Sequence, residues 1–383
     1  MSLTIEQYVK QSYFLRSKAN SDRNSLSRQN IEMLHAEIAD RMKFSIPLHF
    51  INSYNINSCI VPLSSNSDYY HIIDLAMFDY MSEFLNSIEL DVPNYACFFY
   101  RNLRSDICRS NNDSARALLY DPPIMFINKH DADCNSYSKL NMEKYQCMIR
   151  FYFLHEYMHY LIANPIKDSV YQIADDVVEE TLLPHLWNKD NSKFPKEMKP
   201  LQYALYKKFH HTWYKDTNFR EEVYCDFQAI QCLMEYGQTI NIETIFDSIM
   251  SFLYIQHIIW LAKHSWEPLE LGNKFAFRQN ILAAFALLLE DENYSEIISK
   301  LYQQSNRYYI PTKLQMKPLN WEKQGEFYNQ FCQMLRADRS QTISNGSYVF
   351  PAFSQPKYEL SAEYMKMRDI PPWYATPGRN PVP

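Results

Sequence analysis

The segment Phe151–Ala163 reads FYFLHEYMHYLIA and is almost entirely apolar. Its only residues that can carry charge are His155, Glu156 and His159. An apolar run of this length favours a helix inside the protein core. A carboxylate buried there without a partner would cost considerable free energy. The segment therefore predicts a buried helix whose three polar side chains have a defined purpose.

His155, Glu156 and His159 form an HExxH motif on this helix. Residues four apart share a helix face, so the two imidazoles can bind one metal ion. Glu156 lies about 100° further round the helix, as the general base of a metallopeptidase does. Two ligands and a base are the arrangement of a zinc hydrolase. The alternative is a coincidental pair of core histidines.

A catalytic zinc site also needs a third protein ligand and an open position for water. The metzincin continuation of the motif requires glycine and histidine where this chain has Ile162 and Pro165, so that class is excluded. Two acidic segments remain as sources of a ligand, Asp175–Glu180 and Asn218–Ile230.

Glu222 is the favoured third ligand. Asp226 follows it one helical turn later, and Ala229 and Leu233 continue a stripe that is expected to face the core. Glu222 can bind the metal while Asp226 accepts the remaining ring N–H of a ligating histidine and fixes its orientation. The sequence thus predicts a metal ligand and its supporting carboxylate on one helix.

Glu179 and Glu180 stay open as alternatives to Glu222, although Glu179 has no acid four residues further on. Glu221 has a separate explanation. With Asn218 as N-cap, it would complete a capping box at the start of the second helix.

The combination of His155-Glu156-x-x-His159 with Glu222-x-x-x-Asp226 resembles the gluzincin zinc metallopeptidases. It is loosely similar to bacterial cytoplasmic members such as the phage-exclusion metallopeptidase family. The resemblance covers roughly residues 140–240 and implies zinc (Zn2+), hydrolysis of peptide bonds and Glu156 as general base. A peptide or protein substrate is implied, without its identity.

The expected mechanism is that of an intracellular zinc metallopeptidase. His155, His159 and Glu222 hold zinc, which activates a water, and Glu156 removes the proton of that water. A donor to the developing oxyanion is also needed. The candidates for it, which sequence alone cannot rank, are His210, His211, Tyr214, His257, His264 and Arg278.

Two alternative hypotheses place the chain in other classes of protein. A non-catalytic zinc-binding regulator or sensor would use four protein ligands and leave no position for water. A helical interaction scaffold with a chance motif would bind no zinc. The metal content and the number of ligands distinguish these readings from an enzyme.

Composition excludes other chemistries. The net charge is −6 and no long basic run occurs, which argues against a nucleic-acid partner. The five glycines are too far apart for a dinucleotide fold, a phosphate-binding loop or a Gly-x-Ser-x-Gly elbow. Eight cysteines in no regular framework indicate reduced thiols.

Localisation is expected to be cytoplasmic. The amino terminus lacks the basic and then apolar profile of a secretion signal. The longest apolar stretch, Ile249–Ala262, is interrupted by Gln256 and His257 and is expected to be too short to cross a membrane. The sequence therefore predicts no membrane partner, and it does not indicate an oligomeric state.

The expected fold class is α+β and predominantly helical, with a zincin-like core and a small sheet that precedes the HExxH helix. Strand-like runs lie at 48–51, 59–62, 96–100 and 124–127, the last a candidate edge for a peptide substrate. Helices are expected from Ile31 to Met42, at 75–88, 139–163, 171–186, 199–215, 219–236, 240–263, 273–290, 294–305 and 321–336.

Three regions are expected along the chain. Residues 1–120 would form an N-terminal α/β subdomain and residues 121–340 a mainly helical catalytic domain. Residues 341–383 are rich in proline and would form an extended tail.

Overall fold

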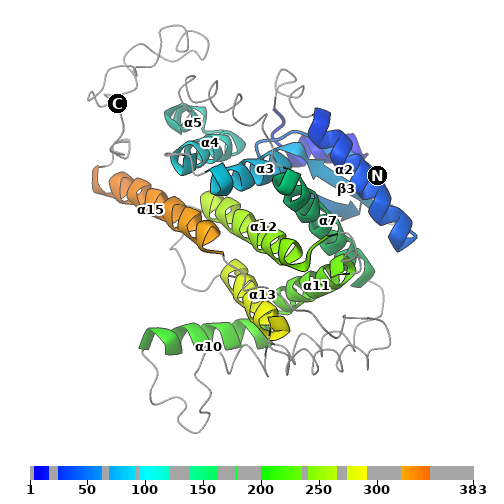
Figure 1. Cartoon of the computed structure of the whole chain (residues 1–383). Helices are drawn as coiled ribbons and strands as arrows, with labels where there is room; N and C mark the ends of the chain where they lie inside the picture. The colour runs from blue at the N-terminus through cyan, green and yellow to red at the C-terminus, as the bar shows by residue number, and fades with distance from the viewer. Residues whose placement is uncertain are drawn as a thin grey trace.

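The computed structural model describes residues 4–16, 25–62, 69–90, 95–120, 139–162, 178, 200–234, 240–264, 274–290 and 321–345. In these residues the protein is mostly helical and has one small three-stranded sheet (Figure 1). The predicted class, predominantly helical α+β with a sheet ahead of the HExxH helix, is confirmed at this level. The predicted division into regions stays a prediction.

In chain order the described helices are α1 (Ile5–Ser12), α2 (Ser25–Met42), α3 (Leu75–Leu90), α4 (Tyr95–Ser110), α5 (Ser114–Tyr120), α7 (Lys139–Ile162), α10 (Pro200–Lys215), α11 (Thr217–Met234), α12 (Ile242–Lys263), α13 (Lys274–Glu290) and α15 (Glu322–Asn345). Eight of the described helices (α2, α3, α7, α10, α11, α12, α13 and α15) overlap the helices expected from the sequence, whereas α1, α4 and α5 were not predicted as helices. α15 continues past 336 and past the predicted start of the extended tail at 341. The segments predicted as helices at 171–186 and 294–305, and as a strand at 124–127, lie outside the described residues, apart from Val178.

The sheet has the strand order β1-β3-β2, with β1 (Leu48–Ile51), β2 (Cys59–Pro62) and β3 (Tyr69–Asp74). β1 pairs with β3 in parallel and β2 pairs with β3 in antiparallel orientation. The two outer strands have the predicted bounds. The central strand β3 was not predicted, and it leads directly into α3.

The prediction of a strand at Ala96–Tyr100 was wrong, because these residues begin the helix α4. A short aromatic run fits a buried strand or a buried helix equally well. The residues that follow decide for the helix. Phe99, Leu103 and Ile107 recur every fourth position and are almost completely buried, so the core-facing stripe of α4 extends well beyond the aromatic run.

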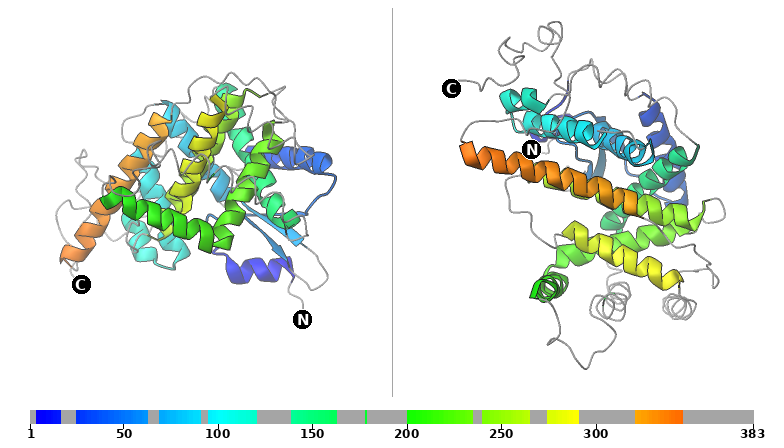
Figure 2. Two further views of the ribbon diagram at one scale, coloured as in Figure 1. Left: turned by 90° about the horizontal axis from the view of Figure 1, so that it is seen from below. Right: turned by 60° about the vertical axis from the view of Figure 1, so that its left-hand side comes forward.

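α12 runs through the middle of the molecule and packs against α7, α3, α4, α13 and α15, and α15 also packs directly against α3 and α4 (Figures 1 and 2). By length and composition α12 is the one helix, among the described residues, that is long and apolar enough to cross a membrane. The expectation that this stretch is too short was wrong, because the helix begins at Ile242. In its most apolar window, 78% is buried inside the protein, as in the core helix of a soluble protein.

The sheet packs against α7 through a completely buried histidine. Nε2 of His71, on β3, lies 2.7 Å from the hydroxyl of Tyr152 on α7. The His71 ring also contacts the rings of Phe153 and Tyr157. Burial lowers the pKa of His71 to about 3. His71 is therefore neutral in the folded protein near pH 6.5, where the same histidine in the unfolded chain begins to bind a proton.

We expect His71 to make the protein sensitive to acid. Its folded pKa lies below the unfolded value near 6.5, so its contribution to stability is present above 6.5 and is lost as pH falls toward 3. The loss approaches about 1.4 kcal/mol for each pH unit. Denaturant unfolding at pH 7 and pH 5 should show a smaller difference in His71→Phe than in the wild type. The exposed His211→Gln is the control, and an equal pH dependence in all three proteins would contradict this role of His71.

Candidate metal centre

α7 brings the HExxH motif into the interior. Phe151, Phe153 and Tyr157 are completely buried on this helix, and His155 is only 4% exposed. α7 packs against α11, α12, α2, α3 and β2. The predicted buried helix is confirmed. The face that carries the two histidines turns toward α11, which holds the acidic stripe.

His155, His159 and Glu222 come together as a group that could hold a metal ion. Nε2 of His155 lies 3.2 Å from Nε2 of His159. The Glu222 oxygens lie 3.3 Å from each of these nitrogens, Oε2 from His155 and Oε1 from His159. Ligand atoms about 2.0–2.1 Å from a tetrahedral zinc ion are separated from one another by about 3.3 Å. The three side chains therefore already have the spacing of zinc ligands.

Each histidine also has a carboxylate beside its other ring nitrogen. Nδ1 of His155 lies 2.9 Å from Oδ1 of Asp226, and Nδ1 of His159 lies 3.1 Å from Oε1 of Glu221. The His159–Glu221 contact is a hydrogen bond of the kind that fixes the orientation and tautomer of a ligating ring. The His155–Asp226 contact has the distance of an ion pair without the geometry of a hydrogen bond. The predicted position of Asp226 next to a histidine is found at His155.

Arg278, on α13, forms hydrogen bonds to two acidic residues of α11, Glu222 and Asp226. Its Nε and Nη2 donate to the two carboxylate oxygens of Asp226 at 2.7 and 2.6 Å. Its Nη1 donates to Oε2 of Glu222 at 2.9 Å. Arg278 is 7% exposed, so these are charge-assisted hydrogen bonds in a mostly dry environment. One guanidinium thus fixes the favoured third ligand and the carboxylate that supports His155.

Negative charge is in excess around the histidines. Four carboxylates, those of Glu156, Glu221, Glu222 and Asp226, lie around the two histidines, and Arg278 pairs with two of them, Glu222 and Asp226. Burial alone would lower the pKa of His155, but Asp226 and Glu222 outweigh it and raise that pKa to about 9. The pKa of His159 is raised in the same way by Glu222. Without a metal the cluster therefore takes up protons, and a divalent cation would replace them.

Glu156 lies beside this group and is half-buried. Its carboxyl interacts electrostatically with His155, His159 and Glu222, and burial raises its pKa. Within the described part of the chain, no side chain donates a hydrogen bond to it. The carboxylate of Glu156 is therefore available to exchange a proton with a bound molecule.

The second helix begins differently from the prediction. α11 starts at Thr217, and the backbone N–H of Phe219 donates to Oδ1 of Asp216 at 3.0 Å. Asp216 therefore caps the helix, and the predicted Asn218–Glu221 capping box was wrong. Glu221 instead contacts His159, a role that the sequence reasoning missed. The position of Glu221 directly before Glu222 in the sequence could have indicated that it lies near the histidines.

The remaining candidates from the sequence are the alternative ligands Glu179 and Glu180 and the possible oxyanion donors. Glu179 and Glu180 lie outside the described residues. Of the possible oxyanion donors, Arg278 is at the cluster but is engaged by Glu222 and Asp226. Nε2 of His257 lies 3.3 Å from the hydroxyl of Tyr328 on α15. His210, His211 and Tyr214 lie on α10, and His264 follows α12. The oxyanion donor therefore stays unassigned.

We expect Arg278→Met to lower the free energy of unfolding by about 3 kcal/mol in metal-free protein. Removing one partner of a buried ion pair costs about 3–5 kcal/mol. The lower end applies because the Glu222 side chain is 37% exposed and water compensates it in part. The measurement is denaturant unfolding without added metal.

Lys274→Met is the matched control for Arg278→Met. Lys274 lies on the same helix and pairs with Asp216 at 2.6 Å, but its side chain is 53% exposed. Removing it should cost less than about 1 kcal/mol. Equal losses in the two variants would show that the buried pair contributes no more than a surface one.

Comparisons with protein-family models, with curated proteins and with solved structures gave no match for this chain.

Proposed function

We propose that the protein is a zinc-dependent metallopeptidase of the gluzincin type, with a zincin-like arrangement of α7 and α11. The observation that carries the proposal is the spacing of 3.2–3.3 Å among His155, His159 and Glu222. This spacing fits tetrahedral zinc, and nitrogen and carboxylate oxygen are ligands that zinc accepts.

Three ligands rather than four favour catalysis over a purely structural metal. Among the described residues, the cluster offers two histidines and one glutamate as ligands. Structural zinc sites are usually closed by four protein ligands, whereas catalytic sites keep one position for water. Glu156, half-buried next to this group, would then face a reacting molecule.

Zinc at this position would supply Lewis acidity, which lowers the pKa of a water and polarises a carbonyl. Glu156 would accept the proton of the attacking water and return it to the leaving nitrogen. Asp226 and Glu221 would hold the imidazoles of His155 and His159 in place. Arg278 would hold the Glu222 carboxylate in the same position before and during the reaction.

The test is hydrolysis of an unfolded protein substrate such as reduced, alkylated casein. We expect cleavage by the purified full-length protein, its loss after treatment with a zinc chelator, and its return on addition of one equivalent of zinc. Cleavage products are identified by mass spectrometry. Cleavage that persists in full after the metal is removed would contradict the proposal.

A further inference from the structure

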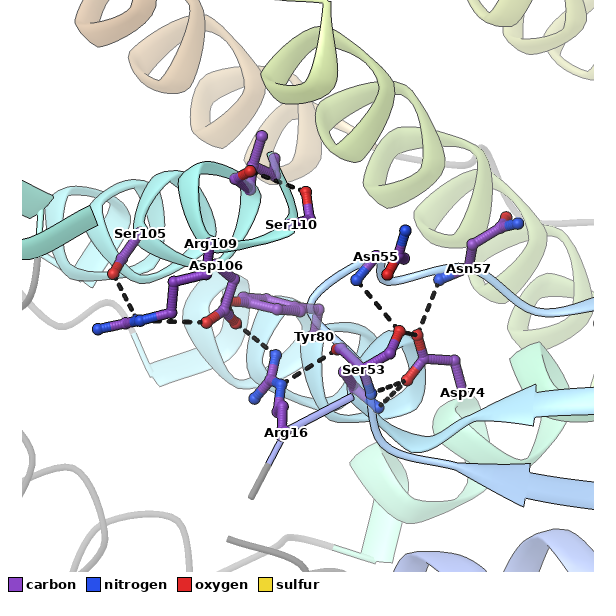
Figure 3. A network of polar contacts seen from close by, with 12 residues as sticks. Arg16, Ser53, Asn55, Asn57, Asp74, Tyr80, Ser105, Asp106, Arg109 and Ser110 are labelled. Atoms are coloured by element: carbon purple, nitrogen blue, oxygen red, sulfur yellow. Dashed lines mark hydrogen bonds and ion pairs between the residues drawn. The ribbon is translucent and has the colours of Figure 1, made fainter. Parts of the chain in front are cut away.

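A second site lies away from the metal centre, where the carboxyl ends of α1, α4 and α12 meet. A cavity of about 480 Å³ opens there, within the size range of small-molecule sites. Its lining includes Tyr8, Ser12, Asn55, Asn57 and Lys263, and none of the described residues that line it is a carboxylate. Figure 3 shows Asn55 and Asn57 on the loop beside Asp74, with Ser110 at the end of α4.

Lys263 is the charged residue of this cavity. Its Nζ donates to the backbone carbonyl of Ile56 at 3.2 Å. Among the described residues no carboxylate lies within ion-pair distance of it. An ammonium has three N–H donors, so two remain for a ligand. Burial lowers the pKa of Lys263 to about 8, as expected for a cation whose charge is incompletely compensated.

The loop between β1 and β2 is held in a strained conformation at this cavity. Ile56 has a φ of 51°, in the left-handed region that β-branched residues rarely adopt. The backbone N–H groups of Ser53 and Asn57 donate to the buried Asp74 at 3.0 and 3.1 Å. These bonds fix the loop so that the Ile56 carbonyl meets Lys263. Strain of this kind concentrates at binding sites.

Hydrogen-bond donors other than Lys263 also face the cavity. Oδ1 of Asn55 accepts from the backbone N–H of Phe14 at 2.7 Å, which leaves the amide N–H groups of Asn55 for a ligand. Asn57 and Asn111 add two further side-chain amides to the lining. A ligand rich in oxygen acceptors would satisfy this set.

The carboxyl ends of three helices meet at the cavity, and part of their terminal carbonyls are engaged within the protein. Carboxyl ends of helices favour cations. At each of these ends at least one of the last four carbonyls accepts a backbone hydrogen bond, Val9 from Tyr13 at 2.9 Å, Ile107 from Asn111 at 3.1 Å and Trp260 from His264 at 3.0 Å. Lys263 itself supplies positive charge in the last turn of α12. The ammonium of Lys263, on which the buried Asp74 also acts electrostatically, is the positive group that an anion would meet in this cavity.

We propose that this cavity binds a small oxyanion, a carboxylate or phosphate group, through the ammonium of Lys263 and the amides of Asn55 and Asn57. The site shares no residue with the metal cluster. The proposal is therefore independent of the proposed peptidase activity.

The test is isothermal titration of the full-length protein with inorganic phosphate, malonate or chloride at constant ionic strength. We expect phosphate or malonate to bind, and chloride not to. Lys263→Met, which keeps the length of the side chain without its charge, should weaken binding at least tenfold. Lys43→Met removes an exposed lysine of the loop after α2 and should leave binding unchanged.

A second variant covers the case in which Lys263→Met does not fold. Asn111 is exposed at the rim of the cavity, so the Asn111→Asp variant should fold. The carboxylate that it adds should weaken the binding of phosphate or malonate. Tighter binding of phosphate or of malonate identifies the kind of oxyanion. No binding of either one, equal binding of chloride, or binding undiminished in the folded cavity variants would overturn the proposal.

Discussion

Glu156→Gln is expected to lower kcat/KM for peptide hydrolysis by about 100- to 10,000-fold, the usual contribution of a general base. The amide has nearly the same shape as the carboxylate but cannot accept the proton of an attacking water. Glu156 is not one of the three grouped ligands, so zinc content should stay at the wild-type value. The measurement combines the hydrolysis rate with metal analysis of the same preparation.

Glu143→Gln on the same helix is the matched control, because Glu143 lies more than three turns before Glu156 and outside the cluster. It should keep wild-type activity. Unchanged activity in Glu156→Gln would exclude Glu156 as the base. Loss of both zinc and activity would instead make it a ligand or a structural residue.

Glu222→Gln is expected to weaken zinc binding by more than about 100-fold. Loss of a partner that only supports a ligand weakens metal binding about 10- to 100-fold, and loss of a ligand should exceed this. Glutamine retains the volume of the side chain and can still accept the hydrogen bond from Arg278. The change therefore removes mainly the negative charge that a cation would meet. Competition with a zinc chelator of known affinity measures it.

Two further variants calibrate the loss of affinity in Glu222→Gln. Glu221→Gln, which alters only the carboxylate beside Nδ1 of His159, should weaken zinc binding by about 10- to 100-fold. Glu32→Gln on the exposed face of α2 should have no effect. An affinity in Glu222→Gln equal to that of the wild type would move the third ligand elsewhere, with Glu179 and Glu180 as the alternatives.

The sequence predicted the centre of the site because the spacing within helices is fixed. Residues four apart on a helix share a face, so the amino-acid sequence alone pairs His155 with His159, and Glu222 with Asp226. Most apolar residues of α7, together with Asp226, Ala229 and Leu233 of the stripe, are buried as expected.

Contacts between distant elements could not be derived in the same way. Arg278 lies 52 positions after Asp226, and only the packing of the helices brings its guanidinium to that carboxylate. The role of Glu221 was hidden by a local explanation, the capping box, that Asp216 made unnecessary. Local rules favour the nearest partner, whereas tertiary packing supplied a different one.

The missed strand has a related cause. β3 reads YYHIID and is bounded by a Ser- and Asn-rich segment, so it carried a strand signal. His71 and Asp74 interrupt its apolar character. Both are completely buried because they have partners elsewhere, His71 in Tyr152 and Asp74 in the loop after β1. Buried polar residues with distant partners make a central strand look like a surface segment.

X-ray absorption spectroscopy on protein reconstituted with one equivalent of zinc distinguishes a catalytic zinc site from a closed structural site and from a cluster that binds no metal. The site formed by His155, His159 and Glu222 predicts one tightly bound zinc per chain. Its coordination shell should contain two imidazole nitrogens and light oxygen ligands at about 2.0–2.1 Å, one of them water, and no sulfur. Absence of stoichiometric zinc binding, or a shell of four protein ligands without water, would contradict the account.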